Sequence, residues 1–536
     1  MELNLADLFE LIADNAPERI AVVSGDEQLT YGELDERSTR LANHLREVGI
    51  GRDDHIGIYA HNRPDWIVTM LAAFKLRAVP INVNFRYVES ELAYVLDNAD
   101  VKAVVHDAAL SPTVEAILDR VPSLQHRVAI PDGSDLAADG TVGIESAIES
   151  ASAERDFGAR SADDHYILYT GGTTGNPKGT VWRHQDILYA ALQGGRPLGE
   201  PLQEADEVLG NLEHPPGSFM VTAPLMHAGG QWAALIGLLT GGKVVLSPPR
   251  GFDPHVIWSI VEREGVQILN LIGDAMARPL AEALAEDPTR YDVSSLFVLS
   301  SGGAVLSPVV KRQLAELLPG VMIVDGFGAS ETGDNGRAMS QDEDGKARFT
   351  INAYTAVLDD DHKPVAPGSG EIGRLAKCGP IPIGYYKDPD KTAETFVEVD
   401  GKRWVIPGDY ATVDADGTVT VLGRGSVSIN TGGEKVYPEE VESVVKAHPA
   451  VWDAMVIGTP SERWGEEVTA LARLRPGHEL TIDDLAEHCR THLAGFKIPR
   501  RLVIVDEIPR TASEKPDYRA AKELVGRSGD GVHEIA

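Results

Sequence analysis

Hydrophobic patterns of helix and of strand alternate along the first 350 residues of this chain, and the alternation limits the folds that it can adopt. Residues 32–48 repeat apolar side chains at helical spacing, residues 55–60 are typical of a strand, residues 66–74 of a helix and residues 103–106 of another strand. Strands that are separated by helices pair in parallel sheets, with the helices packed on the faces. The sequence therefore predicts an α/β fold.

The pattern changes twice further along the chain. From about residue 351 short β-like segments are separated by turns, and beyond residue 425 helix-like and strand-like segments return. At 536 residues the chain is too long for one ordinary domain. We expect an N-terminal domain, residues 1–425, of parallel αβα sheets with a small β-barrel-like subdomain, followed by a small α+β domain, residues 426–536.

The net charge of the chain is −33 at pH 7, which repels a phosphate backbone or an anionic bilayer. General nucleic-acid binding is therefore disfavoured. The charge is uneven, because residues 424–536 carry −4 and the preceding residues carry −29. The nearly neutral C-terminal part is thus able to present a local basic face to a polyanionic ligand.

Targeting and redox signals are weak. The first residues carry acids where a signal peptide needs Lys or Arg, and the longest apolar stretch, around Trp232, is far short of the roughly 20 residues of a membrane span. Two cysteines, Cys378 and Cys489, cannot build a disulfide framework or a Cys-based metal site. We expect a cytoplasmic protein without integral membrane association.

A loop rich in glycine and threonine, Tyr169-Thr-Gly-Gly-Thr-Thr-Gly-Asn-Pro-Lys-Gly179, follows a strand-like segment. Its glycines let backbone N–H groups point at an anion, its threonines add hydroxyl donors, and Lys178 adds positive charge. It is not a Walker A loop, because no Gly-Lys-Ser/Thr follows and Pro177 blocks the start of a helix. The candidate phosphate-binding residues are Thr170, Gly171, Gly172, Thr173, Thr174, Gly175 and Lys178.

This loop resembles the signature of the acyl-adenylate-forming superfamily, which contains acyl-CoA synthetases, peptide-synthetase adenylation domains and beetle luciferases. The resemblance covers nearly the whole chain, from Leu29-Thr-Tyr-Gly-Glu-Leu to Lys515, with the motifs in order. It implies that ATP, with Mg²⁺, and a carboxylic acid form an acyl-adenylate, and that a thiol, usually that of coenzyme A, displaces AMP. The physical task is to bring two anions together and to stabilise charge on the transferring phosphate.

The resemblance assigns nucleotide and metal roles to two further segments. Phe327 would stack on adenine, and Ser330 keeps the hydroxyl of the usual threonine. Glu331 would hold Mg²⁺, a hard cation that takes oxygen ligands, with Thr173 as a second metal contact. The other nucleotide-binding candidates in these segments are Gly302, Gly303, Ala304, Asp325, Gly326 and Gly328.

Other motifs supply contacts to the ribose and to the acid. By resemblance, Asp409 would accept the ribose hydroxyls, and Arg424, at the domain junction, would contact ribose and phosphate. His227 would lie beside the reacting carboxylate, and Gly303 and Gly328 would also line the acyl site. We interpret His227 as substrate-binding rather than catalytic, because a lone histidine is more often a structural hydrogen-bonding residue.

Two C-terminal motifs imply a moving domain. Lys515, in Pro509-Arg-Thr-Ala-Ser-Glu-Lys515, would bridge the substrate carboxylate and the nucleotide oxygens and is the expected adenylation catalyst. Gly432 and Gly433 resemble the loop that enters the active site after rotation of the small domain, where a side chain would block the pantetheine arm. The resemblance thus implies that Lys515 serves the first half-reaction and the Gly432–Gly433 loop the second.

Two positions depart from the usual family pattern. Ser426 stands where Asp or Lys is common, but a branch of actinobacterial ligases for steroid side chains and other bulky acids has a similar string. Glu514 replaces the glycine before Lys515, which stiffens the loop and adds a negative charge beside the lysine. At an effective dielectric constant of ~20, a like charge at 4–6 Å costs about 3–4 kcal/mol before screening.

The leading interpretation is an acyl-CoA synthetase for a bulky alicyclic acid such as a steroid or terpenoid acid, with a medium or long fatty acid as the runner-up. If Glu514 weakens adenylation, the enzyme would chiefly convert an acyl-adenylate supplied by a partner adenylating enzyme to the CoA thioester. Less favoured alternatives are a peptide-synthetase adenylation enzyme, a luciferase-type oxygenase and a catalytically silent binding protein. A homodimer is left open.

Overall fold

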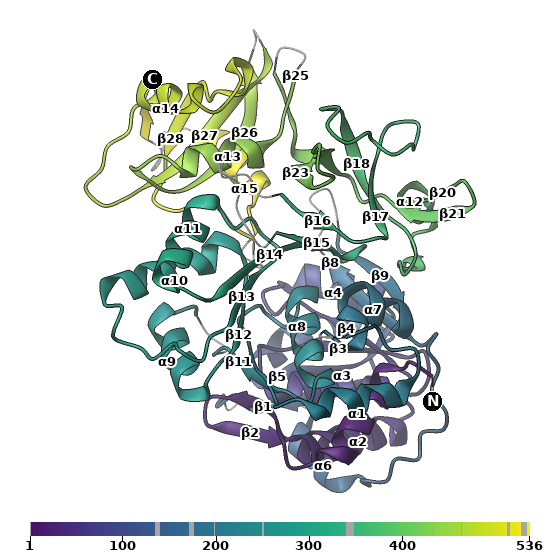
Figure 1. Cartoon of the computed structure of the whole chain (residues 1–536). Helices are drawn as coiled ribbons and strands as arrows, with labels where there is room; N and C mark the ends of the chain where they lie inside the picture. Colours follow the sequence, from purple (N-terminus) through teal and green to yellow (C-terminus); the bar gives the residue numbers. More distant parts are fainter. Residues whose placement is uncertain are drawn as a thin grey trace.

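The computed structural model describes residues 2–134, 140–170, 176–197, 199–248, 251–338, 348–431, 434–461, 464–511, 515–526 and 533–535, with side chains except at 424, 426, 435 and 533–535. These residues form two large sheets covered by helices, an antiparallel sheet beside them and a C-terminal sheet above (Figure 1). The expected α/β class, with a smaller α+β C-terminal part, is confirmed.

The first large sheet has the strand order β16-β15-β14-β13-β12-β10-β11-β1-β2. Its strands are β1 (Ile20–Ser24), β2 (Glu27–Thr30), β10 (Ser218–Val221), β11 (Lys243–Leu246), β12 (Ile268–Leu271), β13 (Val298–Ser301), β14 (Met322–Ala329), β15 (Gly333–Ala338) and β16 (Thr350–Ile351). The central pairs are parallel, whereas β1–β2, β14–β15 and β15–β16 are antiparallel. The sheet is therefore mixed rather than purely parallel, because short hairpins complete its edges.

The second large sheet has the order β19-β9-β8-β4-β3-β5-β6-β7. Its strands are β3 (His55–Tyr59), β4 (Val79–Asn82), β5 (Val101–Asp107), β6 (His126–Ile130), β7 (Val142–Gly143), β8 (His165–Thr170), β9 (Lys178–Arg183) and β19 (Gly384–Tyr385). Strands β4, β3, β5 and β6 run parallel, and β8–β9 is an antiparallel hairpin.

Helices cover both faces of the two sheets (Figure 1). They are α1 (Leu5–Asn15), α2 (Tyr31–Glu47), α3 (Pro64–Lys75), α4 (Glu89–Asn98), α5 (Ser111–Glu115), α6 (Ile144–Ser150), α7 (His184–Ala191), α8 (Ala228–Leu239), α9 (Pro254–Glu264), α10 (Gly273–Glu286) and α11 (Pro308–Leu317). One apolar core joins α1, α2, α3 and α8 to strands of both sheets. A second core lies under α9, α10 and α11, and a third under α4 and α5.

The helix expected over residues 32–48 shows how local sequence sets these elements. It begins at Tyr31, because the Thr30 side chain accepts a hydrogen bond from the backbone N–H of Glu33, whose carboxylate accepts one from the Thr30 backbone. It ends at Glu47, and Gly49 follows with φ +94°. Among the described residues, no helix is both long and apolar enough to cross a bilayer.

The remaining strands form two smaller sheets. One contains β17 (Thr355–Leu358), β18 (Ile372–Lys377), β20 (Phe396–Val399), β21 (Lys402–Val405), β22 (Asp409–Val413) and β23 (Val419–Arg424), with α12 (Pro389–Thr395) beside it. The other contains β24 (Ile429–Thr431), β25 (Glu434–Val436), β26 (Val451–Ser461), β27 (Gly465–Leu474), β28 (Arg501–Ile504) and β29 (His533–Ile535), with α13 (Pro438–Lys446), α14 (Ile482–Arg490) and α15 (Tyr518–Gly526).

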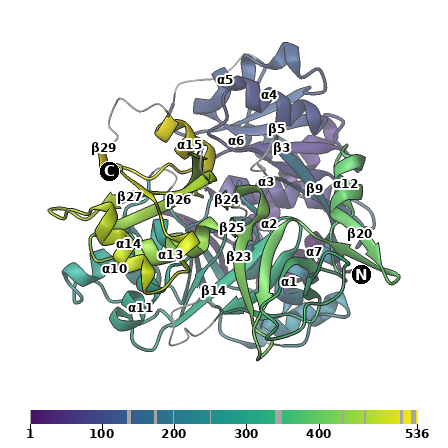
Figure 2. The ribbon, with the colours of Figure 1, turned by 90° about the horizontal axis from the view of Figure 1, so that it is seen from above.

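The C-terminal sheet and its helices α13 and α14 lie over α10 and α11 of the first large sheet, as both views show (Figures 1 and 2). Trp452 of β26 makes a direct contact across this boundary, donating a hydrogen bond from Nε1 to the Glu282 carboxylate of α10 at 3.1 Å. The carboxyl ends of β13 and β14 therefore lie next to the C-terminal part of the chain.

Candidate active site

The floor of the site lies at the carboxyl ends of β13 and β14. Ser301 and Asp325 are partners in this parallel pair. A methyl group added at Gly302 would lie 3.5 Å from the Gly326 carbonyl oxygen, so the two backbones run close together. Gly303 is exposed and has φ +81°, a conformation that favours glycine. Gly302, Gly303 and Gly326 thus form a surface with few side chains, which we call the glycine shelf. It lies at the strand ends where α/β sheets bind ligands.

Asp325 is a buried acid in this floor, with 5% of its surface exposed. Burial, with a smaller contribution from nearby Asp274, raises its pKa to about 7, although the Lys311 ammonium lowers it in part. The carboxyl group therefore changes charge near neutral pH instead of remaining a permanent anion. This suits a group that donates or accepts a hydrogen bond at a nucleotide base.

Phe327 and Gly328 follow on the same strand. The half-buried Phe327 ring packs edge-on against Phe349, with the centroids 4.6 Å apart. A methyl group at Gly328 would lie 2.0 Å from the Gly333 carbonyl oxygen, so only glycine fits in this hairpin. Ala304, on the neighbouring segment, packs against the core under α10 and α11. The ring of Phe327 is thereby fixed beside the glycine shelf.

Glu331 is held by a contact that the motif does not show. Its Oε1 accepts a hydrogen bond from the Tyr385 hydroxyl at 3.0 Å, and Tyr385 belongs to β19 of the other large sheet. The neighbouring Ser330 carbonyl oxygen accepts a hydrogen bond from Trp182 Nε1 at 2.9 Å. Glu331 thus stands where the two large sheets meet, half-buried and available to a cation.

The phosphate loop connects β8 to β9. Thr170 and Lys178 are its first and last described anchors and are partners in the antiparallel ladder. The loop residues Gly171, Gly172, Thr173, Thr174 and Gly175 lie outside the described residues. A methyl group at Gly179 would lie 2.6 Å from Tyr169 Cε2, so the hairpin closes tightly just below the loop. Lys178 forms an ion pair with Asp388, which caps α12.

His227 immediately precedes α8, at its N-cap position. Its Nε2 is buried and has no hydrogen-bond partner among the described residues. Burial, together with the positive charges of Lys515 and Arg86, lowers the pKa of His227 to about 3. Asn82 ties this loop to β8, because its amide donates to the carbonyl oxygens of Met226 and Tyr169. The site therefore presents a neutral imidazole near two cations, a setting that attracts a carboxylate.

Lys515 reaches this site from the C-terminal part of the chain. Its side chain is exposed, and a methyl group added at Gly303 would lie 4.0 Å from its Cε. Together with its effect on His227, this places Lys515 over the glycine shelf. Glu514, immediately before it, lies outside the described residues.

The other expected residues are placed only in part. Asp409 and Arg424 are partners in the β22–β23 ladder, which puts two nucleotide-binding candidates side by side at the edge of their sheet. The side chain of Arg424 is not among those described. Gly432 and Gly433 also lie outside the described residues, between the paired residues Thr431 and Glu434.

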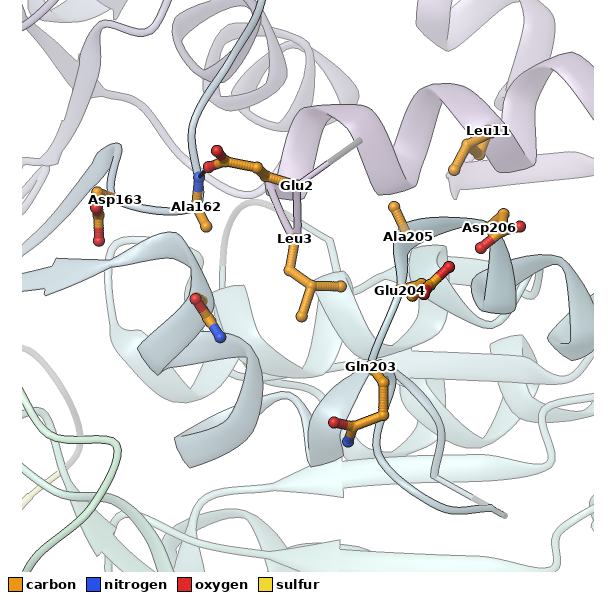
Figure 3. Close-up of a pocket in the computed structure, with 10 residues that line it drawn as sticks. Glu2, Leu3, Leu11, Ala162, Asp163, Gln203, Glu204, Ala205 and Asp206 are labelled. Atoms are coloured by element: carbon orange, nitrogen blue, oxygen red, sulfur yellow. Dashed lines mark hydrogen bonds between the residues drawn. The ribbon is translucent and has the colours of Figure 1, made fainter.

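A hollow of about 800 Å³ elsewhere is not this site (Figure 3). It lies at the start of α1, where Glu2 accepts a hydrogen bond from the Ala162 backbone N–H at 2.7 Å. Its lining includes Glu2, Leu3, Leu11, Ala162, Asp163, Gln185, Gln203, Glu204, Ala205 and Asp206. Four of these side chains are acidic, so the hollow repels a nucleotide phosphate.

Three residues near the site were not expected from the sequence. Tyr385 and Asp388 come from a short segment about 200 residues after the phosphate loop, and Arg86 follows β4. None stands in a motif that the resemblance used. The detectable signal is weak: a Gly-Tyr-Tyr-Lys string before the acidic cap of a helix.

Comparisons with known proteins identify the family of the chain. Residues 9–386 match the model of the AMP-binding enzyme family, and residues 440–515 match its C-terminal domain. The chain is 47% identical to 3-oxocholest-4-en-26-oate–CoA ligase of Rhodococcus rhodochrous, over 99% of this chain and 98% of that protein. It is also 47% identical to a medium/long-chain-fatty-acid–CoA/3-oxocholest-4-en-26-oate–CoA ligase of Mycolicibacterium smegmatis, with the same coverage.

Solved structures of similar fold are also known. The crystal structure of the anthranilate CoA ligase AuaEII with anthranoyl-AMP superposes with a TM-score of 0.84 at 25% identity, covering 98% of each chain. The resemblance to the acyl-adenylate-forming superfamily, and to its actinobacterial steroid-acid branch, is confirmed. The chain therefore belongs to the AMP-binding enzyme family, and the two curated relatives named above, which it matches along nearly their whole length, are CoA ligases.

Proposed function

We propose that this enzyme is an AMP-forming acyl-CoA synthetase that activates a bulky alicyclic acid, such as a steroid side-chain acid, and that also accepts medium or long fatty acids. One observation carries the proposal: Lys515 lies over Gly303, which follows β13, and is near enough to His227, at the start of α8, to lower its pKa. The names of the two relatives supply the acid class.

In the first half-reaction the chain's own groups bring two anions together. The substrate carboxylate lies between neutral His227 and the Lys515 ammonium, whose charge offsets the repulsion between that carboxylate and the ATP phosphates. Phe327 supports adenine, Asp409 and Arg424 bind the ribose side, and Thr170 and Lys178 hold phosphate oxygens. The carboxylate oxygen attacks the α-phosphate, and pyrophosphate leaves.

Glu331 fits a Mg²⁺ site. The ion usually binds proteins through one or two carboxylates and takes its other ligands from substrate phosphates and water. Glu331 offers one such carboxylate, oriented by Tyr385, and the described residues contain no group of three or more His, Cys, Asp or Glu arranged around a metal. Mg²⁺ would neutralise phosphate charge there, with Thr173 as an additional ligand.

The second half-reaction needs the C-terminal part to rotate. We propose a domain boundary at residues 425/426, supported by the end of one sheet at Arg424 and the start of the next at Ile429. Rotation withdraws Lys515 and brings the Gly432–Gly433 loop to the acyl-adenylate, where the CoA thiol displaces AMP. All these steps use one chain, so they need neither a partner enzyme nor a second copy. We also propose a cytoplasmic location, which suits the low cysteine content and the acidic first residues.

The test is CoA-thioester formation measured by mass spectrometry, with polycyclic, aliphatic and aromatic acids in parallel. Each acid is supplied once with ATP and once as the presynthesised acyl-adenylate. Product from both inputs, with highest kcat/KM for polycyclic acids, is the expected result. Product from the adenylate alone would instead show that Glu514 impairs adenylation, and Glu514→Gly should then restore the ATP-dependent reaction. Ligand-induced thermal stabilisation without any turnover would favour a silent binding protein.

A further inference from the structure

The backbone of Lys515 is held by the chain segment that precedes it. The Lys515 carbonyl oxygen accepts hydrogen bonds from the backbone N–H and the hydroxyl of Thr511, at 2.8 and 3.2 Å. Arg510 and Pro516 form a β-bridge, and the Asp517 N–H donates to the Pro509 carbonyl oxygen at 3.1 Å. Whatever fixes residues 509–511 therefore also fixes Lys515.

Arg510 is anchored to a buried carboxylate. Its guanidinium donates to Oδ2 of Asp453, a β26 residue with 4% of its surface exposed. The other oxygen of Asp453 lies 3.3 Å from Lys446 Nζ and accepts a hydrogen bond from the Ala454 N–H. Burial opposes ionisation of Asp453, but Lys446 and Arg510 hold its pKa below the ordinary value. Asp453 is thus an ionised carboxylate that pairs with both Arg510 and Lys446.

Lys446 carries the connection across to α10. It is 7% exposed, and its Nζ lies 3.9 Å from Oδ2 of Asp274 in the first turn of that helix. Asp274 accepts a hydrogen bond from the Ser307 N–H at 2.7 Å and donates its own N–H to the Val305 carbonyl oxygen at 3.0 Å. Val305 and Ser307 follow Gly303 closely in the chain, and Gly303 is the residue that Lys515 approaches. A chain of contacts thus runs from Lys515 through Arg510, Asp453 and Lys446 to Asp274, next to the segment that contains Gly303. We call this chain of contacts the positioning circuit.

A second set of contacts on α10 also joins the C-terminal part of the chain to this helix. Asp274, Arg278 and Glu282 are spaced by four residues, so they lie along one side of α10. The Glu282 carboxylate accepts a hydrogen bond from Trp452 Nε1 at 3.1 Å and lies 3.4 Å from Arg475 Nη1. The Arg278 guanidinium lies over the Trp452 ring, 5.8 Å from its centroid.

We propose that Asp453 and Arg510 are positioning residues for adenylation: they hold the Lys515 segment over Gly303 and His227 while Lys446 docks on Asp274. This inference rests on the proposed role of Lys515. A lysine side chain has several rotatable bonds, and misplacement of a reacting group by about 1 Å can cost on the order of 100-fold in rate. The thioester half-reaction, which does not use Lys515, should not need this circuit.

The experiment compares Asp453→Asn, Arg510→Gln and Arg510→Lys in the full-length enzyme. Adenylation is measured as acid-dependent ATP–pyrophosphate exchange, and the second half-reaction as thioester formation from presynthesised acyl-adenylate and CoA. We expect Asp453→Asn and Arg510→Gln to lower kcat for exchange by about 10- to 100-fold, with less than a threefold change in KM for ATP. Thioester formation should stay within twofold, and Arg510→Lys should restore part of the exchange activity.

Two controls keep the result decisive. Arg519 is an exposed arginine close to Lys515 in the sequence, and its 4.0 Å ion pair with Glu523 is not part of the circuit. Arg519→Gln should therefore leave both half-reactions unchanged. Lys515→Ala should abolish exchange; if it does not, the proposed role of Lys515 fails. If Lys515→Ala abolishes exchange but the Asp453 and Arg510 variants leave it intact, or lower both half-reactions equally, the positioning circuit alone is wrong.

Discussion

Lys178, the cation at the end of the phosphate loop, forms an ion pair with Asp388, the residue that caps α12. The Asp388 side chain also accepts a hydrogen bond from the Lys391 backbone N–H at 3.0 Å, so its position does not depend on Lys178. Hydrogen bonding to Lys178 lowers the pKa of Asp388 below its ordinary value, so it remains an anion at neutral pH. ATP phosphates must therefore compete with Asp388 for Lys178.

This competition predicts that Asp388→Asn strengthens ATP binding. Asparagine keeps the helix cap but removes the negative charge. Because the pair is partly exposed and screened by solvent, we expect a modest effect, a two- to fivefold lower KM for ATP at roughly 0.05 M salt that shrinks at higher salt. Steady-state kinetics measure it, with Asp361→Asn on an exposed turn as the control. A raised KM would mean that Asp388 helps to orient Lys178 for phosphate.

Glycine at position 328 is expected to be indispensable for the β14–β15 hairpin. An added methyl group would lie 2.0 Å from a backbone oxygen, which cannot move aside as a side-chain tip can. We expect Gly328→Ala to lower the free energy of unfolding by about 1–3 kcal/mol and to weaken ATP binding. Gly51→Ala, where nothing lies within 4 Å of the added group, should be neutral. Urea unfolding compares the two, and equal stability would show that the hairpin adapts.

Much of this fold follows from sequence pattern, but the partners in the site do not. Residues 32–48 predict α2 to within one residue at each end because their apolar repeat is local, and the structure adds the cap at Thr30. In contrast, Glu331 meets Tyr385 only because the two-residue strand β19 adds to β9. A pairing of that length has almost no sequence signature, since it is set by the docking of two sheets. The same holds for Asp453 and Arg510, which are joined through tertiary packing.

Removing the charge of Glu331 should change the response to Mg²⁺. We expect Glu331→Gln to raise the Mg²⁺ concentration for half-maximal pyrophosphate exchange by about 10-fold or more, because an amide oxygen is a weaker ligand for this ion than a carboxylate. Tyr385→Phe keeps the carboxylate but removes its hydrogen bond, so a smaller increase should result. A magnesium titration at saturating ATP measures both. An unchanged titration curve for Glu331→Gln would assign the metal to other groups.

The buried acid Asp325 predicts a pH-dependent stability. Its folded pKa is about 7 against an ordinary 3.8, so its contribution to stability is fully present below pH 3.8 and is lost as the pH rises through 7. An asparagine side chain does not titrate, so Asp325→Asn should become more stable relative to the parent enzyme between pH 5 and 8, by at most about 3 kcal/mol. Chemical unfolding at several pH values tests this. A difference that is constant with pH would mean that the carboxyl group is ionised throughout.

His227 predicts the opposite dependence on the acid side. Burial first, and then Lys515 and Arg86, lower its pKa to about 3, so the folded enzyme holds a neutral imidazole through the pH range of any practical assay. The unfolded chain binds a proton at this position below about pH 6.5, so stability is lost as the pH falls from 6.5 toward 3. His227→Gln should remove that part of the loss, whereas His478→Gln, at an exposed position, should not. NMR of the ring protons is the direct measurement, and a titration midpoint near 6.5 would contradict the neutral, desolvated state on which carboxylate binding at this site depends.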